Sequence, residues 1–300
     1  MKKAIISGVT GQDGFFLKKL LEKNNYSVLG LSRKNNRDRK IIKTDYSNKS
    51  LKKIINSFNP DEIYNLTGLT KPSESWDYPK ENFFANLNIT LNFLEIIKKK
   101  SNIKFFNASS SEIFGETDKE LDENSKIFPK NPYGISKSAS YFLVDAYRSK
   151  YDLFLVNAIL FNHDSFIRDN TFLFKYLFNS CLNIKKNKIK KIKIKDSRPV
   201  RDFGCAKDFV SYFYRLMQIK KSGNFVVATG KSYSVKQIVN IYKKKFNLSK
   251  DVFEFQNNFD FKKLHKIKKA NNKKLIKTLK LSKIKKAPEV IANLIKDLNR

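Results

Sequence analysis

The chain has 300 residues, of which 41% are hydrophobic, and it carries a formal net charge of +33. The hydrophobic fraction is too high for a disordered chain, two cysteines are too few for a disulfide framework, and no apolar stretch is long enough to span a membrane. The two cysteines also make a reducing compartment the default, so we expect a cytoplasmic location. Only nine of the 61 basic residues are arginines, which phosphate-binding surfaces favour, so we expect solvated lysine faces and no specific nucleic-acid partner.

The first half of the chain alternates short apolar runs with amphipathic stretches. Strands are predicted at 3–7, 26–31, 41–44, 62–66, 103–107 and 153–160, and helices at 15–24, 51–58, 82–100 and 137–150. The helix at 82–100 should bury one face, formed by Ala85, Ile89, Phe93 and Ile96. Apolar strands that alternate with helices indicate a parallel sheet covered on both faces, which is a doubly wound α/β domain.

Beyond about residue 165 the pattern is looser. Helices are predicted at 171–183, 207–220 and 235–246, with a short strand at 224–228. The stretch 184–195 is either an edge strand or the basic end of a helix, and the lysine-dense tail from residue 261 keeps apolar residues at helical spacing. We expect residues 1–165 to form the large domain, which elements from 200–230 are able to join, and residues 166–300 to form a smaller α/β domain.

A glycine-rich turn lies between the first predicted strand and the first predicted helix. It contains Gly8, Gly11, Gln12, Asp13 and Gly14. Glycines let the backbone lie close to a pyrophosphate, and the amino terminus of the following helix offers N–H groups without helical partners. The position of the turn therefore predicts a dinucleotide-binding site.

The residues after the second predicted strand indicate which dinucleotide is bound. An acidic residue there usually binds the ribose of NAD, whereas this chain has Arg33, which suits the 2′-phosphate of NADP. We therefore expect NADP in preference to NAD. Asp45, after the third predicted strand, is either a contact to the adenine or a loop or cap aspartate.

Tyr133 and Lys137 are four residues apart, which places both side chains on one face of a helix. A lysine ammonium beside a phenol favours the phenolate and lowers the pKa of the phenol, so that the tyrosine can accept a proton near neutral pH. A lysine-rich chain contains this spacing by chance, but here Ser110 and Glu112 follow the fifth predicted strand and add further polar groups. Two histidines and two cysteines leave no credible metal cluster, and His163 is expected to be packed or hydrogen-bonded.

Taken together, these segments resemble the GDP-mannose 4,6-dehydratase family of extended short-chain dehydrogenases/reductases. The motifs that carry the resemblance stand in the family's order and cover most of the chain to about residue 246; they lie at 8–14, 108–115, 132–137, 159–165, 201–208 and 228–235. The resemblance implies an NADP-binding Rossmann domain over residues 1–165, a sugar-nucleotide-binding domain over 166–300, and a homo-oligomer, either a dimer or a tetramer.

The resemblance also assigns roles to individual residues. Tyr133, helped by Lys137, would take the proton from a sugar 4-hydroxyl, and Ser110 would hydrogen-bond the same oxygen. Lys137 would also bind the cofactor. Glu112 would remove the C5 proton while water is lost from C6, which yields a 4-keto-6-deoxy sugar.

For the substrate, Asn162 would contact the sugar nucleotide and Arg201 its diphosphate.

The chain also departs from the family pattern, and two of these departures concern its binding sites. The segment between Arg33 and Asp45 is shorter than in the family, and Lys262 stands where the family has an arginine.

Glu112 separates the possible functions, because a dehydratase needs an acid/base group at C5 whereas a simple 4-epimerase does not. The enzymatic alternative is a 4-keto-6-deoxysugar reductase or a sugar-nucleotide epimerase that uses the same Tyr133 and Lys137. An alternative of another class is a non-catalytic protein that binds nucleotides or nucleic acid on a Rossmann scaffold. The leading prediction is a GDP-mannose 4,6-dehydratase-like hydro-lyase of deoxysugar biosynthesis.

Overall fold

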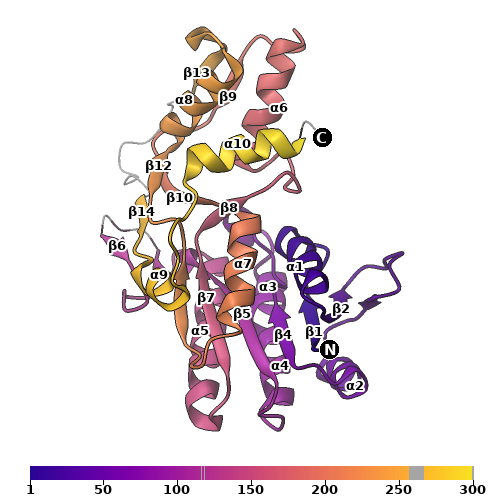
Figure 1. The fold of residues 1–300 in the computed structure, drawn as a ribbon. Coiled ribbons are helices and arrows are strands. Elements are labelled where there is room, and N and C mark those ends of the chain that lie inside the picture. The colour runs from indigo at the N-terminus through magenta and orange to yellow at the C-terminus, as the bar shows by residue number, and fades with distance from the viewer. Residues whose placement is uncertain (116, 118, 257–266, 299–300) are drawn as a thin grey trace.

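The computed structural model describes residues 1–115, 117, 119–256 and 267–298, so the prediction made for Lys262 lies outside the described residues. Figure 1 shows a large lower lobe built around a seven-stranded sheet and a smaller upper lobe that is mostly helical. Within the described residues, no helix is both long enough and apolar enough to cross a membrane.

The large sheet is parallel throughout. Its order is β11-β7-β5-β4-β1-β2-β3, with β1 at Lys3–Ser7, β2 at Ser27–Ser32, β3 at Ile41–Lys43, β4 at Glu62–Asn65, β5 at Lys104–Ser110, β7 at Leu155–Leu160 and β11 at Asn224–Val227. The chain moves outward from β1 in one direction through β2 and β3, and from β4 in the other direction through β5, β7 and β11. The carboxyl ends of β1 and β4 therefore flank a topological switch point, where ligands bind in such sheets. The predicted doubly wound α/β fold is confirmed.

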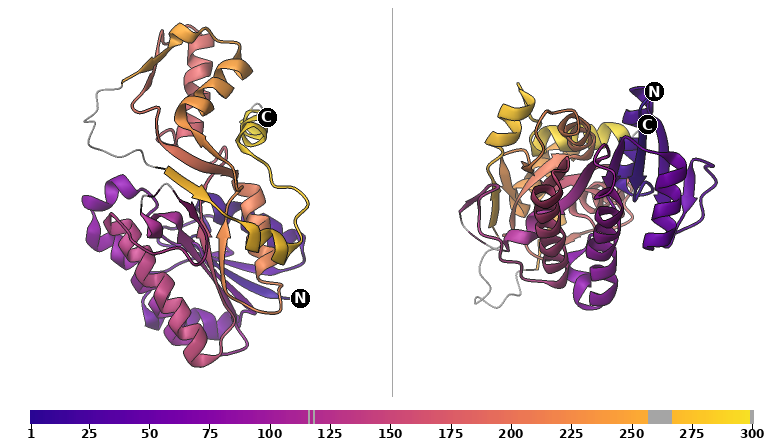
Figure 2. Two further views of the ribbon diagram at one scale, coloured as in Figure 1. Left: turned by 90° about the vertical axis from the view of Figure 1, so that its left-hand side faces the viewer. Right: turned by 90° about the horizontal axis from the view of Figure 1, so that it is seen from below.

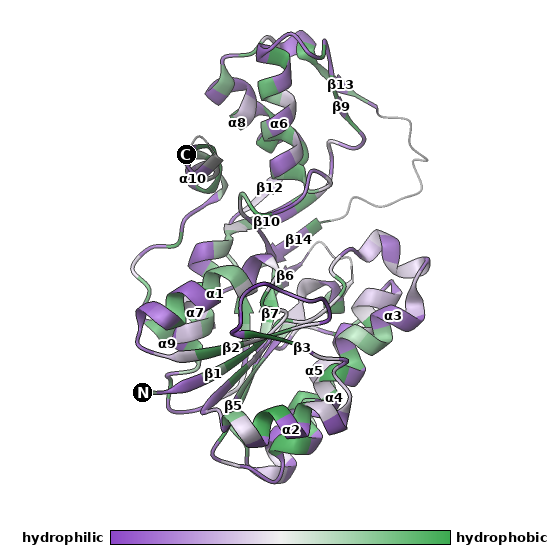
Figure 3. Ribbon diagram, turned by 90° about the vertical axis from the view of Figure 1, so that its right-hand side faces the viewer, coloured by the Kyte–Doolittle hydropathy of each residue, from purple (hydrophilic) through white to green (hydrophobic). Residues whose placement is uncertain are grey.

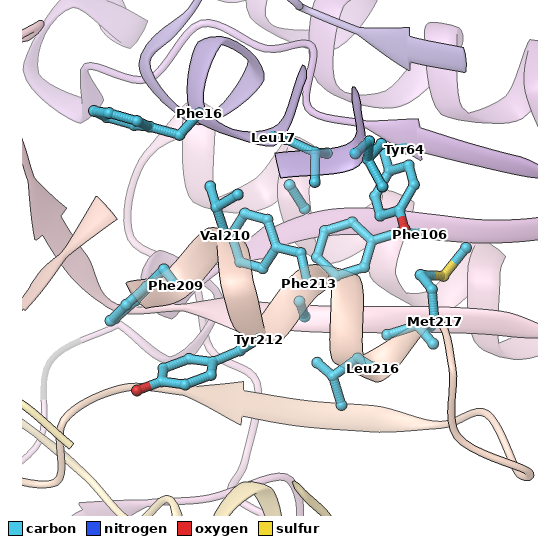
Figure 4. Packing of buried hydrophobic residues seen from close by; sticks show 14 of the residues in the cluster. Phe16, Leu17, Tyr64, Phe106, Phe209, Val210, Tyr212, Phe213, Leu216 and Met217 are labelled. Carbon is cyan, nitrogen blue, oxygen red and sulfur yellow. The ribbon is translucent and has the colours of Figure 1, made fainter. Parts of the chain in front are cut away.

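Helices cover both faces of the sheet, each through an apolar stripe. One face packs against α1 (Gln12–Lys23), α7 (Ala206–Leu216) and α9 (Lys273–Leu279), and the other against α2 (Asn48–Phe58), α4 (Ile89–Ile97) and α5 (Pro132–Tyr151). Figure 4 shows Phe213 of α7 lying against Phe106 of β5, with their ring centroids 4.7 Å apart. In Figure 3 the strands β1 and β2 are strongly hydrophobic, whereas the loop that follows β2 is hydrophilic.

The helix predicted at 82–100 is divided in the structure. It consists of α3 (Pro79–Phe83), a π-helical turn η2 (Phe84–Asn88) and α4, and the predicted apolar face is buried as expected. Thr90 donates its hydroxyl hydrogen to the carbonyl of Asn86 at 3.1 Å, and such side-chain bonds compete with the regular helical ladder. The π turn is of functional interest because it buries the side chain of Asn86 beside the switch point.

The upper lobe has its own hydrophobic core. It is formed by α6 (Leu173–Lys185), α8 (Val235–Phe246), α10 (Ala287–Leu298), β9 (Ile192–Ile194) and β13 (Phe253–Phe255), with the short η4 (Lys250–Val252) beside them. Residues 184–195 contain both alternatives that the sequence left open, because α6 ends at Lys185 and β9 then pairs with β13.

A smaller sheet connects the two lobes. Its strand β10 (Val200–Cys205) pairs with β8 (Asn162–Asp164), β12 (Ser232–Ser234) and β14 (Ile267–Ala270), and β14 also pairs with β6 (Glu120–Leu121). Figure 2 shows this sheet between the helices of the upper lobe and the large sheet. The remaining short helices, η1 (Pro72–Trp76) and η3 (Ser111–Phe114), follow β4 and β5 on the carboxyl side of the large sheet.

Candidate active site

The glycine turn after β1 is packed so tightly that two of its positions accept only glycine. Gly8 has φ of +76°, and a Cβ there would lie 2.9 Å from the backbone of Leu66. At Gly14 a Cβ would lie 2.5 Å from the carbonyl oxygen of Gly8 and from the Cα of Val9. The close packing brings the first-turn N–H groups of α1 to the carboxyl edge of the sheet, where they can face an anion.

A groove of about 310 Å³ lies over this turn. It is lined by the turn itself, by the residues after β2 and by the residues after β4: Gly8, Thr10, Gly11, Gln12, Asp13, Gly14, Ser32, Arg33, Lys34, Tyr46, Leu66, Thr67, Gly68, Thr70 and Arg168. Arg33 is exposed at the end of β2 and carries a positive charge into the groove. The lining matches the residues that the sequence assigned to a dinucleotide, apart from Asp45 and Lys137.

Asp45 lies in a neighbouring, larger groove that Arg33 also lines. Its carboxylate accepts a hydrogen bond from the backbone N–H of Ser47 at 2.9 Å, and this bond lowers the pKa of Asp45. Ser47 is the N-cap of α2. Asp45 therefore has the turn role that was one of its two predicted roles, while its carboxylate shares a groove with Arg33.

The side chains of Gln12 and Asp13 join the turn to the segment around β8. Ser165 donates its hydroxyl hydrogen to Oε1 of Gln12 at 2.8 Å, and the carboxylate of Asp13 lies 2.9 Å from Nε2 of His163. Burial disfavours both charges of this pair, but their mutual attraction outweighs it, so the pKa of Asp13 is lowered and that of His163 is raised. His163 also stacks on Phe209, which confirms that it is a packed, hydrogen-bonded residue.

A second cavity, of about 200 Å³, adjoins the groove and brings together all four predicted catalytic residues and Asn162. Ser110, Glu112, Tyr133, Lys137 and Asn162 all line it, from β5, η3, α5 and β8. The groove and the cavity share lining residues: Asp13, Leu66, Gly68, Thr70 and Arg168. A ligand in the groove would therefore extend toward the cavity.

The start of α5 positions the tyrosine and lysine. Asn131 is the N-cap and accepts a hydrogen bond from the N–H of Gly134 at 2.7 Å, and Pro132 occupies the first helical position. Gly134 allows close approach to η3, because a Cβ there would lie 2.7 Å from the carbonyl oxygen of Glu112. Tyr133 and Lys137 then lie one turn apart and line the same cavity.

Burial dominates the electrostatics of this pair. It raises the pKa of Tyr133 to about 12, against a lowering effect of the Ser110 hydroxyl, and it lowers the pKa of Lys137 to about 8. The Lys137 ammonium donates a hydrogen bond to the carbonyl of Ala108 at 2.8 Å. The spacing of Tyr133 and Lys137 predicted a lowered pKa of the phenol. This prediction is wrong for the described protein groups, because burial raises that pKa.

Glu112 is held as a carboxylate. Its Oε1 forms an ion pair with the ammonium of Lys268, and its Oε2 accepts a hydrogen bond from Nδ2 of Asn131 at 3.3 Å. Burial raises the pKa of Glu112, but the charges of Lys268 and Arg201 outweigh burial and hold this pKa below its ordinary value. An ionised carboxylate in this cavity can accept a proton from a carbon atom of a ligand that lies beside Tyr133.

In the described part of the chain, two predicted site residues line neither the groove nor the cavity: Asp45, in its neighbouring groove, and Arg201. Arg201 is half-buried on β10, and its Nη1 donates a hydrogen bond to the carbonyl of Val200 at 2.9 Å. Its charge still acts on the cavity, because it lowers the pKa of Glu112.

Three residues of the site were not assigned from the sequence. Arg168 lines both the groove and the cavity, and its place among only nine arginines was a usable signal. Asn86 is 1% exposed, its Oδ1 has no hydrogen-bond partner among the described residues, and a Cβ at Gly68 would collide with it. Lys268 lies in a lysine-dense tail, where composition gives no signal.

Over the residues described, no group of three His, Cys, Asp or Glu side chains is placed to hold a metal ion.

Comparisons with known proteins agree with this geometry. A family model described as GDP-mannose 4,6 dehydratase matches residues 5–291. GDP-mannose 4,6-dehydratase of Vibrio cholerae is 32% identical over 265 residues, which are 79% of this chain and 70% of that protein, and the Cricetulus griseus enzyme is 31% identical with the same coverage.

Solved structures share the fold at lower identity. MoeE5 in complex with UDP-glucuronic acid and NAD has a TM-score of 0.86 at 20% identity and covers 99% of both chains. RMD from Pseudomonas aeruginosa complexed with NADPH has a TM-score of 0.84 at 18% identity and covers 99% of this chain and 98% of its own. From the match over nearly the whole chain and the identity to the curated relatives, this chain belongs to the GDP-mannose 4,6-dehydratase family, a family of hydro-lyases.

Proposed function

We propose that the chain converts GDP-mannose to GDP-4-keto-6-deoxymannose, with NADP as its cofactor. The observation that carries this proposal is an ionised Glu112 in the same cavity as Tyr133 and Lys137. The tyrosine and lysine would suffice for a 4-keto-sugar reductase or an epimerase. A carboxylate beside them is the additional group that removal of a C5 proton requires.

The groove over the glycine turn fits a dinucleotide. Backbone packing at Gly8 and Gly14 leaves no room for side chains, and the amino terminus of α1 offers N–H groups to a pyrophosphate. Arg33 is placed after β2, where a guanidinium suits a 2′-phosphate. The Oδ1 of Asn86, which has no hydrogen-bond partner among the described residues, lies beside Gly68, and Gly68 lines both the groove and the cavity. When bound, the nicotinamide would accept a hydride from C4 of the sugar and return it to C6.

The first chemical task of the protein is to remove the proton from the 4-hydroxyl. Tyr133 takes this proton, and Ser110, which lines the same cavity, hydrogen-bonds the oxygen from which it leaves. Burial raises the pKa of Tyr133 to about 12, so the phenol must lose its own proton before it can accept that of the sugar; the positive charge of Lys137, one helical turn away, favours the phenolate.

The second task is elimination. The ketone formed at C4 acidifies the proton at C5, which Glu112 accepts while the C5–C6 double bond forms and the C6–O bond breaks. The proton now on Glu112 is available to the departing hydroxyl, which leaves as water, so that the carboxylate is regenerated. When the hydride returns to C6, C5 must take up one proton, and the proton that Tyr133 removed from the 4-hydroxyl supplies this equivalent. Tyr133 is then regenerated, and atoms and charge balance without a further co-reactant.

The substrate would extend from the cavity toward the second lobe. Asn162 lines the cavity from β8 and would contact the sugar nucleotide, while Arg201 on β10 would meet the diphosphate. We therefore propose the division into an NADP-binding part over residues 1–165, to which β11 and α7 are added, and a sugar-nucleotide-binding part over residues 166–300.

We also propose a homo-oligomer. Large apolar side chains are exposed on neighbouring elements η1, η2 and α5: Trp76, Phe84, Ile135 and Phe142. Exposed apolar residues of this size on adjacent elements are typical of subunit interfaces. Sedimentation equilibrium should give a dimer or tetramer in the wild type, and a monomer at all protein concentrations would contradict this proposal.

The function is tested by incubating the purified protein with GDP-, UDP-, CDP- and dTDP-sugars, with NADP or NAD, and identifying products by NMR. We expect a 4-keto-6-deoxy product from GDP-mannose with NADP. Glu112→Gln should bind the cofactor normally and lose elimination, whereas the control Glu254→Gln, an exposed change on β13, should retain it. Absence of a 4-keto product from GDP-mannose would overturn the proposal.

A further inference from the structure

Lys268 differs from almost every other lysine of this chain. Within the described residues only two lysine side chains are buried, Lys137 and Lys268, and Lys268 is 2% exposed. Both are at the same cavity, since Lys137 lines it and the ammonium of Lys268 pairs with Glu112, which also lines it. The partners of this ion pair are 156 positions apart in the sequence, so the fold brings them together.

The pleat of β14 determines the direction of the Lys268 side chain. β14 is held between β10 and β6, with Lys268 opposite Arg201 and Lys269 opposite Glu120. Side chains alternate along a strand, so that Lys268 and Ala270 are buried while Lys269 between them is exposed. The pairing on both sides therefore directs Lys268 to the buried face of β14.

A buried ion pair is a poor way to stabilise a fold. Desolvation of the ammonium and the carboxylate costs free energy that their attraction only offsets, and an apolar pair of similar volume is often equally stable. The chain nevertheless places a lysine against the carboxylate that the proposed elimination needs. Stability alone does not require a lysine at this place. The location of Lys268 therefore indicates a role in the chemistry.

We propose that Lys268 is a positioning residue of the active site, which holds the carboxylate of Glu112 in the orientation and charge state needed to remove a C5 proton. This assignment rests on the proposed function. Lys268 engages Oε1 and Asn131 engages Oε2, so the carboxylate is oriented from both sides and cannot rotate freely. Lys268 acts through Glu112 and does not itself need to touch the sugar.

Among the residues that the structure describes, three charged or titratable groups face Glu112 from the elements packed around it. They are Lys268 on β14, Arg201 on β10 and Tyr133 on α5. Burial raises the pKa of Glu112, and Lys268 is the strongest of the groups that lower it. Removing the charge at position 268 raises the pKa of Glu112, so the acidic limb of the pH profile of elimination should move to higher pH.

The test compares the wild type with Lys268→Met, Lys268→Gln and Lys268→Arg, using Lys269→Met as a control of the same chemistry on the exposed side of the strand. Single-turnover formation of NADPH from GDP-mannose and NADP reports oxidation at C4, and formation of the 4-keto-6-deoxy product reports elimination. Lys268→Met and Lys268→Gln should oxidise C4 as the wild type does and lose roughly 10- to 100-fold in elimination. Their acidic limb should shift to higher pH, while Lys268→Arg and Lys269→Met retain the wild-type limb.

The outcomes separate this assignment from the proposed function. If the wild type makes no 4-keto-6-deoxy sugar, the proposed function fails and the role of Lys268 fails with it. If the wild type is active and Lys268→Met eliminates at the same rate with the same acidic limb, the role of Lys268 alone is wrong. If Lys268→Met does not fold, as judged by circular dichroism and cofactor binding, the pH profiles of Lys268→Gln and Lys268→Arg test the role of Lys268. Equal pH profiles of these two variants would overturn the assignment.

Discussion

Replacement of Gly14 by alanine tests whether the glycine turn is built around a ligand or only around a bend in the chain. In the structure a Cβ at this position would lie 2.5 Å from the carbonyl oxygen of Gly8 and the Cα of Val9, whereas ordinary contacts of a Cβ begin near 3.4 Å. The overlap is therefore about 0.9 Å, and it involves backbone atoms that cannot rotate away. The turn between β1 and α1 must open to accept the methyl group.

The expected loss follows from this overlap. Overpacking typically costs about 1–3 kcal/mol, and a backbone contact belongs at the upper end of that range. We expect Gly14→Ala to lower the free energy of unfolding by about 3 kcal/mol, or to bind NADP about 100-fold more weakly if the opened turn displaces the first N–H groups of α1.

Urea unfolding and fluorescence titration with NADP measure the two effects. Gly223→Ala is the matched control, because a Cβ there would contact only Phe225 at 3.9 Å. It should change the free energy of unfolding by less than about 1 kcal/mol. A Gly14→Ala variant with wild-type stability and wild-type NADP affinity would refute the reasoning.

Three further predictions concern the site. Tyr133→Phe should lower kcat by about 10²- to 10⁴-fold with unchanged NADP affinity, because the proton acceptor is lost while packing is kept; equal turnover in a product assay would exclude Tyr133 from this role. The raised pKa of His163 beside Asp13 means that their attraction contributes fully to stability below the ordinary histidine pKa of 6.5 and is lost as pH rises through the raised value. Urea unfolding of the wild type should therefore show falling stability above pH 6.5, and Asp13→Asn should remove this dependence; an unchanged pH dependence in the variant would contradict the ion pair. Arg33→Ala should weaken NADP binding by roughly 10- to 100-fold and leave NAD binding nearly unchanged, as titration calorimetry can measure, whereas equal losses for both would show that Arg33 does not meet the 2′-phosphate.

The parts of the fold that depend on local signals could be predicted from the sequence. The glycine turn between β1 and α1 follows from residue types at fixed spacing, and the buried face of the helix around Phe93 follows from helical periodicity. The same holds for Tyr133 and Lys137, whose spacing on α5 places them on one face whatever the rest of the fold does.

Features that depend on contacts distant in the sequence could not be predicted. The ion pair of Asp13 and His163 joins residues 150 positions apart. The pairing of β14 with β10 brings Lys268 to Glu112 from a tail whose composition marks no lysine as special. The π turn that buries Asn86 keeps the same apolar face as a regular helix, so periodicity does not reveal it. The raised pKa of Tyr133 likewise follows from burial, which residue spacing does not report.

The most direct test of the proposed reaction follows one hydrogen atom through it. GDP-mannose labelled with deuterium at C4 is incubated with the wild-type protein and catalytic NADP, and the product is examined by NMR and mass spectrometry. The proposed sequence of C4 oxidation, elimination and C6 reduction predicts a 4-keto-6-deoxy sugar that carries the deuterium at C6. A product that keeps the deuterium at C4, as an epimerase would give, or recovery of unchanged GDP-mannose, would contradict the account.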